Sequence, residues 1–451
     1  MRLKLKDQYR IRKEEDFAII FDRRTEKIQK KLNRISLLEY ELLKLFNGKY
    51  TKLEICNLIS KNVEPNLVNE YLDAFCQKYQ KYLVECTKED IRTDIIVKKD
   101  YFKKENYASN LRLSTPLFIS LVLTKNCTSY CKYCFSDSNQ PNVQSVFLDT
   151  KDIVRLIDEC KRLGIANINL TGGDPFSHPE IIEILKEVIN SEIDFNISTK
   201  KILSDSEIKQ LKNIGLKELQ ISLDSSNNEI ASYLTGVKDY YVKMKQVISK
   251  LLKDGIKVKV NSVLTSYNIE TIPKLIKDLD EIGVKTLFLT PYNNSLGRHD
   301  DLFFPTFLQY RNLNHYLSAY QGNIKIDYQS PRLFSDKKQL SDIQSCSGGR
   351  MGLVIYPDGN TSICERIFDN KFSVGNIKKE MILNIWQGEA LTKLIEPERK
   401  NFLNSKCYDC ENYNLCIYKK GLCFARAKMI NDNYWSNDPL CPKDAAYYRF
   451  S

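Results

Sequence analysis

Short apolar runs alternate with amphipathic stretches through the middle of the chain. Each run has four to eight residues, many of them Val, Ile, Leu or Phe, and the stretches between them repeat apolar residues at spacings of three and four. This alternation predicts strand–helix units that form a parallel sheet of the α/β class. The predicted strands are residues 117–123, 167–170, 194–198, 218–223, 257–264 and 285–290.

Two of the predicted helices end at a glycine, Gly164 and Gly255, which is the residue that a helix C-terminus favours. The six strand–helix units predict a partial (β/α)6 TIM barrel over residues 116–330. In a parallel barrel the reacting groups lie at the carboxyl ends of the strands. The residues that follow each strand are therefore the candidates for a functional site.

Polar and small residues follow four of the predicted strands. They are Cys127, Cys131 and Cys134 after the first strand, Gly172, Gly173 and Asp174 after the second, Ser198 at the end of the third, and Ser222 and Asp224 at the end of the fourth. A pair of glycines lets the backbone approach a ligand closely, and a carboxylate suits an ammonium group. The pattern predicts a ligand site on one rim of the barrel.

The spacing of the first three cysteines favours a metal centre. Disulfides are typical of oxidising compartments and small secreted domains, whereas this chain has 451 residues. Three thiolates can hold three irons of a 4Fe-4S cluster and leave one iron open to a small molecule. A structural zinc site is the alternative, and it needs a fourth ligand such as His178. Four scattered cysteines, Cys56, Cys76, Cys86 and Cys160, are expected to be small buried apolar side chains.

Length and charge limit the class of protein. A chain of 451 residues is too long for one ordinary core, so two to four domains are expected. No apolar stretch has the length of a signal peptide or a membrane span, which predicts a cytoplasmic protein without membrane contact. The net charge of +11 suits an acidic partner, although solvated Lys faces explain such a balance more often.

Seven further cysteines lie near the C-terminus, within residues 331–451, among Gly, Asn and Asp residues. They are Cys346, Cys364, Cys407, Cys410, Cys416, Cys423 and Cys441. A packed core has no use for thiols in polar loops, so these residues are predicted to bind metal. Iron–sulfur clusters and structural zinc are the two kinds of site that such spacing allows.

Residues 1–85 have a different pattern from the barrel. Two short runs, residues 8–14 and 16–22, predict strands, and three amphipathic stretches predict helices over residues 35–50, 51–62 and 66–84. Ser36 suits the start of the first helix and Gly48 its end. Strands followed by three helices predict a winged-helix-like domain, and the basic residues 23–34 would suit DNA. The polar residues 86–115 are predicted to be a linker.

The CxxxCxxC pattern of residues 127–134, with Tyr133 at its aromatic position, resembles the signature of radical S-adenosylmethionine (SAM) enzymes. The sequence TGGDP at residues 171–175 resembles their GGE motif. The resemblance implies an open iron that binds the amino and carboxylate groups of SAM, whose cleavage yields a 5′-deoxyadenosyl radical. It also implies contacts of Gly172, Gly173 and Asp174 with the methionine amine, and of Ser198, Ser222 and Asp224 with the methionine or ribose.

Two positions depart from that family pattern. Asp174 stands where the motif has Glu, which shortens the reach by one methylene. Thr235 and Gly236 stand where the family often has Arg-Gly, so no cationic contact with the SAM carboxylate is carried over.

The C-terminal cysteines resemble the SPASM extension of radical SAM enzymes, which usually binds two auxiliary 4Fe-4S clusters and here implies three clusters in total. By its wiring, Cys407, Cys410, Cys416 and Cys441 would hold the outer cluster, and Cys346, Cys364 and Cys423 the inner one. Two complete clusters would take eight thiolates, and seven are present. The inner cluster is therefore expected to have an open or non-thiolate position. The six-residue gap between Cys416 and Cys423, where three is usual, departs from the pattern.

A winged-helix-like domain ahead of such a core resembles the recognition element of enzymes that modify ribosomally synthesised peptides (RiPPs). That element binds a leader peptide as an added strand at a sheet edge. The whole chain resembles the subtilosin-type maturases, which implies hydrogen abstraction from a precursor peptide and an intramolecular cross-link. The expected partners are a precursor peptide with its leader on residues 1–85 and a reductant such as flavodoxin or ferredoxin, with no nucleic acid.

The expected cross-link is a thioether. The alternatives are a carbon–carbon or carbon–oxygen peptide cyclase and an anaerobic sulfatase-type maturase. A further alternative, from another class of protein, is a redox-sensing regulator that binds DNA and carries iron–sulfur clusters. The sequence assigns no residue as the general base.

Overall fold

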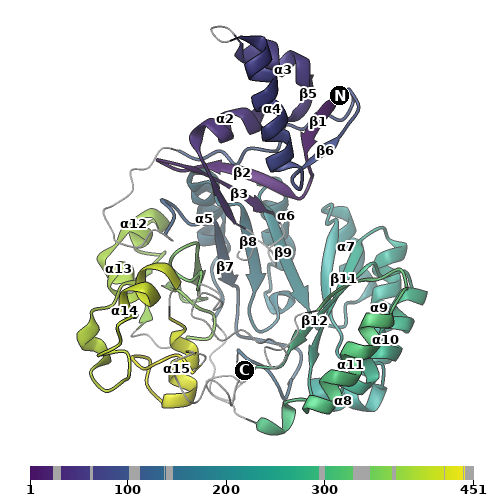
Figure 1. Cartoon of the computed structure of the whole chain (residues 1–451). Coiled ribbons are helices and arrows are strands. Elements are labelled where there is room, and N and C mark those ends of the chain that lie inside the picture. The colour runs from purple at the N-terminus through teal and green to yellow at the C-terminus, as the bar shows by residue number, and fades with distance from the viewer. Residues whose placement is uncertain are drawn as a thin grey trace.

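A computed structural model gives the fold of the chain (Figure 1). It describes residues 1–23, 32–60, 64–100, 112–136, 138, 146–293, 300–328, 346–367, 372–420, 422–439 and 441. The basic stretch at residues 23–34 falls largely outside these ranges.

The centre of the molecule is a sheet of parallel strands. In spatial order the sheet runs β13-β12-β11-β10-β9-β8-β7, and then continues into β14-β15-β16. The central strands are β7 (Phe118–Val122), β8 (Asn167–Thr171), β9 (Asp194–Thr199), β10 (Glu218–Ser222), β11 (Lys257–Leu264), β12 (Thr286–Pro291) and β13 (Lys325–Tyr328). All six predicted strands are present, and the predicted partial barrel is confirmed. The parallel strand β13 was not predicted.

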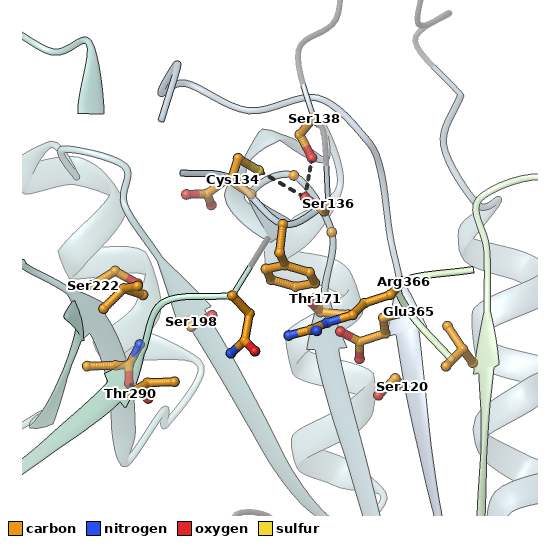
Figure 2. Close-up of a pocket in the computed structure, with 18 of the residues that line it drawn as sticks. Ser120, Cys134, Ser136, Ser138, Thr171, Ser198, Ser222, Thr290, Glu365 and Arg366 are labelled. Carbon is orange, nitrogen blue, oxygen red and sulfur yellow. Dashed lines mark hydrogen bonds between the residues drawn. The ribbon is translucent and has the colours of Figure 1, made fainter. Parts of the chain in front are cut away.

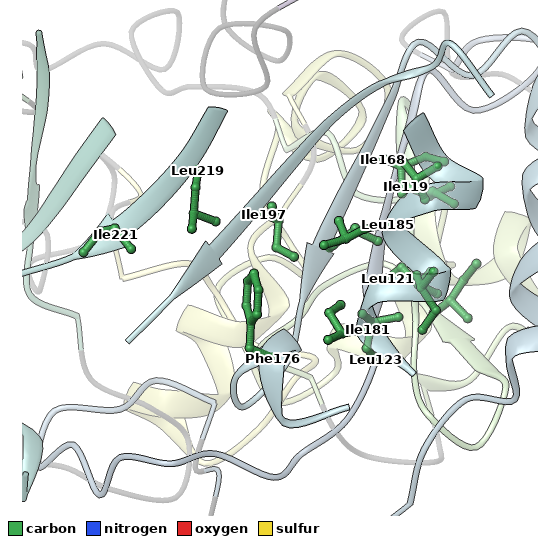
Figure 3. Close-up of a cluster of buried hydrophobic side chains, with 14 of the residues drawn as sticks. Ile119, Leu121, Leu123, Ile168, Phe176, Ile181, Leu185, Ile197, Leu219 and Ile221 are labelled. Atoms are coloured by element: carbon green, nitrogen blue, oxygen red, sulfur yellow. The ribbon is translucent and has the colours of Figure 1, made fainter. Parts of the chain in front are cut away.

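Amphipathic helices connect these strands and cover the outside of the sheet. They are α5 (Thr150–Leu163), α6 (Ile181–Asn190), α7 (Asp205–Asn213), α8 (Asn228–Thr235), α9 (Tyr240–Lys253), α10 (Ile272–Glu281) and α11 (Phe307–Ala319). Gly164 ends α5 in the left-handed conformation, as its position predicts. Alternate strand residues, such as Ile119, Leu121 and Ile197, pack against the helices in one apolar core (Figure 3). This core fixes the strand ends from which the site is built.

The described part of the N-terminal domain contains two small sheets and three helices. Its sheets have the orders β5-β1-β6 and β2-β3-β4. The strands are β1 (Arg2–Leu5), β2 (Tyr9–Lys13), β3 (Ala18–Asp22), β4 (Asn33–Ile35), β5 (Asn47–Thr51) and β6 (Leu83–Glu85), and the helices are α2 (Leu37–Leu45), α3 (Lys52–Ile59) and α4 (Pro65–Tyr79). Ser36 caps α2 as predicted, but Gly48 lies within β5 and does not end the helix. The pairing of β5 with β1 draws these residues into the sheet.

The N-terminal domain is fixed to the amino end of β7. The buried Arg12 side chain donates to the carbonyls of Pro116 and Gly164, both at 2.8 Å, and pairs with Glu14. Glu14 in turn accepts hydrogen bonds from the backbone and the hydroxyl of Ser114. A buried ion pair with this many hydrogen bonds is held in one geometry. The domain therefore has a defined position at the end of the barrel opposite to the strand carboxyl ends.

The C-terminal segment extends the central sheet. Strand β14 (Gly352–Ile355) pairs in parallel with β7, and β15 (Asn360–Ser362) and β16 (Gly375–Asn376) follow as antiparallel strands. The helices that follow are α12 (Ile382–Gln387), α13 (Glu389–Ile395), α14 (Tyr413–Leu415) and α15 (Phe424–Asn431). Gly352 lies opposite Phe118, and β15 runs back along β14 with Ser362 opposite Val354, so Cys364 lies toward the amino end of β7. Within the described residues, no helix has the length and apolarity needed to cross a membrane.

Candidate functional site

A cavity of about 630 Å³ opens at the carboxyl ends of the barrel strands. The loop after β7 contributes Cys127, Cys131 and Cys134 to its wall, and the C-terminal segment contributes Cys346 and Cys364. Figure 2 shows the polar groups along the strand ends, among them Thr171, Ser198, Ser222 and Thr290, together with Glu365 and Arg366. One cavity therefore joins two cysteine groups that are more than two hundred residues apart in sequence.

The loop that carries the first cysteines is anchored to α8. The backbone N–H groups of Tyr130 and Lys132 donate to the carbonyls of Thr235 and Leu234, at 2.8 and 3.0 Å. Burial raises the pKa of Cys131 to about 12 and that of Cys127 to about 11. The Cys131 thiol interacts electrostatically with Cys127 and Cys134, and the Cys127 thiol with Cys134. The three thiols therefore lie together at the cavity wall.

The donor set fits a cluster better than a single ion. Within the described residues, no three His, Cys, Asp or Glu side chains converge closely enough to hold one metal ion. A 4Fe-4S cluster places each thiolate on a different iron, so its ligands are spread more widely. His178, the alternative zinc ligand, is buried, and its Nε2 lies 3.1 Å from the Leu148 carbonyl oxygen. The residues present thus fit the cluster that the cysteine spacing predicts.

Two glycines allow the loop after β8 to pack against the cysteine loop. A Cβ atom on Gly172 would lie 2.3 Å from the Thr124 carbonyl oxygen, and one on Gly173 would lie 2.2 Å from that of Asn126. The backbone of Gly173 also donates to Thr124, at 2.8 Å. The glycine pair is therefore required by the close approach of two backbones, one of which leads directly into Cys127. Its predicted contact with the methionine amine stays a prediction.

Replacing Gly173 by alanine should lower the formation of 5′-deoxyadenosine at least about tenfold, because the new methyl group displaces the backbone next to Cys127. The iron content of the anaerobically reconstituted chain should fall as well. Gly283→Ala is the comparison variant, because a Cβ added there would have no atom within 4 Å and the change brings only the local strain of an alanine at positive φ, far from the cysteine loop in sequence. Equal activity and iron content in the two variants would contradict this account.

Asp174 connects the ends of β8 and β9. Its carboxylate accepts hydrogen bonds from the backbone N–H of Phe176 (2.9 Å), from the Thr199 hydroxyl (2.8 Å) and from the backbone N–H of Lys200 (2.8 Å). The side chain is buried, and burial raises its pKa against the opposing effect of these donors. Asp174 therefore fixes the two loops relative to each other, and its contact with a methionine amine stays a prediction.

A buried polar cluster lies behind the cysteine loop. The Asp224 carboxylate accepts hydrogen bonds from the backbone of Val263 (2.8 Å), from the Lys200 ammonium (2.8 Å) and from the Tyr133 hydroxyl. The Lys200 Nζ also lies 2.8 Å from the Tyr133 hydroxyl oxygen. Two predicted cofactor-binding residues, Tyr133 and Asp224, are thus joined by Lys200, which the sequence did not single out.

Ser198 and Ser222 lie at the cavity wall, at the ends of β9 and β10. The Ser222 carbonyl accepts a hydrogen bond from the buried Tyr240 hydroxyl at 2.7 Å, which orients the end of its strand. Both side chains therefore face the cavity where the sequence placed them, and their contacts with SAM stay predictions.

Glu365 was also missed at the sequence level. It follows Cys364 in the cavity wall and accepts a long hydrogen bond of 3.4 Å from the Asn169 amide. Burial raises its pKa, while hydrogen bonds with Ser120 and Asn169 oppose that rise. Its position directly after a predicted ligand is the only sequence signal that could have identified it.

The structure sorts the C-terminal cysteines into two groups. The thiols of Cys346, Cys364 and Cys423 interact electrostatically with one another. Those of Cys407, Cys410, Cys416 and Cys441 form the second group. These are the inner and outer sets that the SPASM resemblance implies, although their ligation of clusters stays a prediction. The inner group is the one that reaches the cavity, through Cys346 and Cys364.

Comparison with known proteins agrees with this arrangement. A model of the Radical SAM superfamily matches residues 121–300, and the SPASM model, an iron–sulfur cluster-binding domain, matches residues 346–411. The PqqA peptide cyclase of Ruegeria pomeroyi is 22% identical over 353 residues, which cover 76% of this chain and 91% of that protein. The AdoMet-dependent heme synthase of Methanosarcina barkeri is 26% identical over 349 residues, which cover 73% of this chain and 97% of that protein.

A similar fold occurs in the crystal structure of Streptococcus suis SuiB bound to its precursor peptide SuiA. The TM-score is 0.66 at 17% identity, and the match covers 98% of this chain and 99% of that one. The domain matches confirm the predicted radical SAM and SPASM organisation and the predicted classes of cofactor. These cofactors are SAM, a 4Fe-4S cluster and auxiliary iron–sulfur clusters.

Proposed function

We propose that this chain, which carries a radical SAM domain and a SPASM iron–sulfur domain, cross-links a ribosomally synthesised precursor peptide through a thioether. When bound, SAM and its cluster supply a 5′-deoxyadenosyl radical that removes a hydrogen atom from carbon. The chain's own residues hold the peptide, exclude water and position the two cysteine groups.

The observation that carries the proposal is the cavity that contains cysteines of both groups. Cys127, Cys131 and Cys134 line one part of it, and Cys346 and Cys364 line another. A peptide residue in this cavity can be close to the site of hydrogen abstraction and to the inner cysteine group at once. The inner group has three cysteines, which leaves room for a substrate thiolate at a fourth ligand position.

The proposed reaction balances as follows. A thiol S–H bond and a peptide C–H bond break, and one C–S bond forms. One hydrogen atom would pass to the deoxyadenosyl radical. The other would leave as a proton, to a base or to water, and an electron, which an oxidised iron–sulfur cluster held by the C-terminal cysteines would take up. A carbon–carbon or carbon–oxygen link would remove the same two hydrogen atoms from the peptide, so the type of bond must be read from the fragments.

The experiment is mass spectrometry of the precursor peptide after reaction with reduced, anaerobic protein and SAM. Each cross-link should remove two hydrogen atoms, and fragmentation should place a thioether between a cysteine and a carbon of another residue. A cross-link that involves no cysteine of the peptide would show that the bond is carbon–carbon or carbon–oxygen and not a thioether. Formylglycine would indicate the sulfatase-type activity, and 5′-deoxyadenosine formation without any peptide change would overturn the proposal.

The leader peptide is proposed to add a strand to the β2-β3-β4 sheet at β4. The outer edge of β2 is already covered, because Ile11 exchanges backbone hydrogen bonds with Ile95 (2.8 Å) and Val97 (2.9 Å). Among the described residues, β4 is the last strand on the other side of this sheet. Leu38, in the first turn of α2 just after β4, is 62% exposed and offers an apolar contact for a leader side chain.

Replacing Leu38 by aspartate should weaken leader binding about tenfold, because a charge replaces the apolar contact. The helix should tolerate the change, since an acidic residue in the first turn is favourable to the helix dipole. Leu403→Asp is the matched control, because Leu403 is equally exposed, at 62%, in the C-terminal segment. Fluorescence anisotropy of a labelled leader peptide on the full-length chain measures the effect, and equal affinities in both variants would exclude this edge.

A further inference from the structure

The Lys200 side chain is a buried cation next to the loop that carries the radical SAM cysteines. Its ammonium group lies 2.8 Å from an Asp224 carboxylate oxygen and 2.8 Å from the hydroxyl oxygen of Tyr133, which stands between Cys131 and Cys134 in sequence. Only 17% of the Lys200 side chain and 1% of that of Asp224 are exposed. The pair is therefore shielded from the solvent screening that weakens surface charges.

Lys200 is also held rigidly at its backbone. Its N–H donates to Asp174 at 2.8 Å, and the neighbouring Thr199 hydroxyl donates to the same carboxylate. The side chain then runs from the end of β9 to the end of β10, where Asp224 follows the strand. A charge fixed at both ends of its side chain acts on its surroundings without the cost of reorientation.

The positive end of the pair lies on the side of the cavity, and the negative end lies deeper in the protein. Lys200 lines the cavity together with Cys127, Cys131 and Cys134, whereas Asp224 is not among the described lining residues. The Asp224 side chain is also the more deeply buried of the two, with 1% exposed against 17% for Lys200. Burial lowers the pKa of Lys200, but Asp224 opposes this effect and the net shift is upward, as expected for an ammonium group 2.8 Å from a carboxylate oxygen.

We propose that the Lys200–Asp224 pair sets the reduction potential of the radical SAM cluster, with Lys200 raising it and Asp224 lowering it. Reduction adds one negative charge to a cluster held by three thiolates. A nearby cation stabilises that added charge, and a nearby carboxylate destabilises it. Because Lys200 lines the cavity with these cysteines whereas Asp224 is buried behind it, the pair as a whole makes the cluster easier to reduce. The inference rests on the assignment of Cys127, Cys131 and Cys134 to this cluster.

The test is a redox titration of the full-length, reconstituted protein, followed by electron paramagnetic resonance in the absence of SAM and peptide. The signal of this cluster is the one that is lost in Cys134→Ala, and the auxiliary signals serve as internal references. In Lys200→Met the reduction equilibrium constant should fall about tenfold, which is ~59 mV for a one-electron couple. In Asp224→Asn the reduction equilibrium constant should rise. In Lys200→Arg, which keeps the charge, this constant should stay within about threefold of the parent value.

The double variant Lys200→Met/Asp224→Asn decides the question even if the single variants fold poorly, because it leaves no buried charge without a partner. Its potential should lie below that of the parent and above that of Lys200→Met. A purely structural role would shift both single variants in the same direction or not at all, and either result would overturn the proposal. A double variant at or above the parent potential would do so as well. If the parent protein had no signal that disappears in Cys134→Ala, the assignment of Cys127, Cys131 and Cys134 to this cluster would be wrong.

Discussion

The Cys134→Ala protein should form no detectable 5′-deoxyadenosine when it is reduced with dithionite in the presence of SAM, a loss of at least about a hundredfold. Cys134 is one of three thiols that line the cavity at the end of β7. Its Sγ lies 3.2 Å from the Ser136 hydroxyl. The sequence of residues 124–136 contains no cysteine besides these three that could replace it. With two thiolates left, the cluster loses the ligand set that keeps one iron open for SAM.

The matched control for this change is Cys76→Ala. Cys76 is a half-buried residue of α4, in the N-terminal domain, and belongs to neither cysteine group of the cavity. This variant should keep parental 5′-deoxyadenosine formation and parental iron content. Turnover above about a tenth of the parent rate in Cys134→Ala would show that the assignment of the site is wrong.

The barrel and its rim could be predicted from the sequence because both depend on regular patterns. Apolar strand residues such as Ile119, Leu121 and Ile197 recur with the period of a strand, and helices with a single apolar face separate them. In a parallel sheet all strand carboxyl ends meet at one edge, so the residues after each strand share one rim. This reasoning located the first cysteine loop, the glycine pair and the two serines without a structure.

Lys200 could not be predicted in this way, because its role depends on its surroundings. Its neighbour Lys201 has the same chemistry but is 28% exposed and pairs with the partly exposed Glu207. Only the alignment of β9 with β10 places the Lys200 ammonium against Asp224. Nothing in the local sequence distinguishes a buried cation from a solvated one when two lysines are adjacent.

In the N-terminal domain the predicted strands at residues 8–14 and 16–22 are present as β2 and β3, but β1, β4, β5 and β6 escaped prediction for a related reason. Strand β5 contains Asn47, Gly48 and Lys49, which are poor strand formers, and it forms through its pairing with β1. The helix predicted over residues 35–50 therefore ends at Leu45. Tertiary pairing overrode the local signal of a helix followed by a glycine cap.

The Cys364→Ala protein should still cleave SAM but should yield at least about tenfold less cross-linked peptide. Cys364 lines the cavity as a member of the inner group, and it interacts with Cys346 and Cys423 rather than with the first cysteine loop. The site of radical formation should therefore survive, whereas the group that would accept the substrate thiolate and the second electron is lost. The ratio of cross-linked peptide to 5′-deoxyadenosine, measured by mass spectrometry in one reaction, reports this uncoupling.

Cys86→Ala is the control for that experiment, since Cys86 is a half-buried cysteine of the N-terminal domain with no cysteine among its electrostatic neighbours. It should keep the parental ratio. If Cys364→Ala formed the cross-link at the parental rate, the inner cysteines would have only a structural role, and the link would have to form at the first cysteine group alone. If Cys364→Ala formed neither cross-linked peptide nor 5′-deoxyadenosine, loss of the inner group would also disturb the first cysteine group. The two groups could affect each other in this way because β14 pairs with β7, the strand that leads into the cysteine loop.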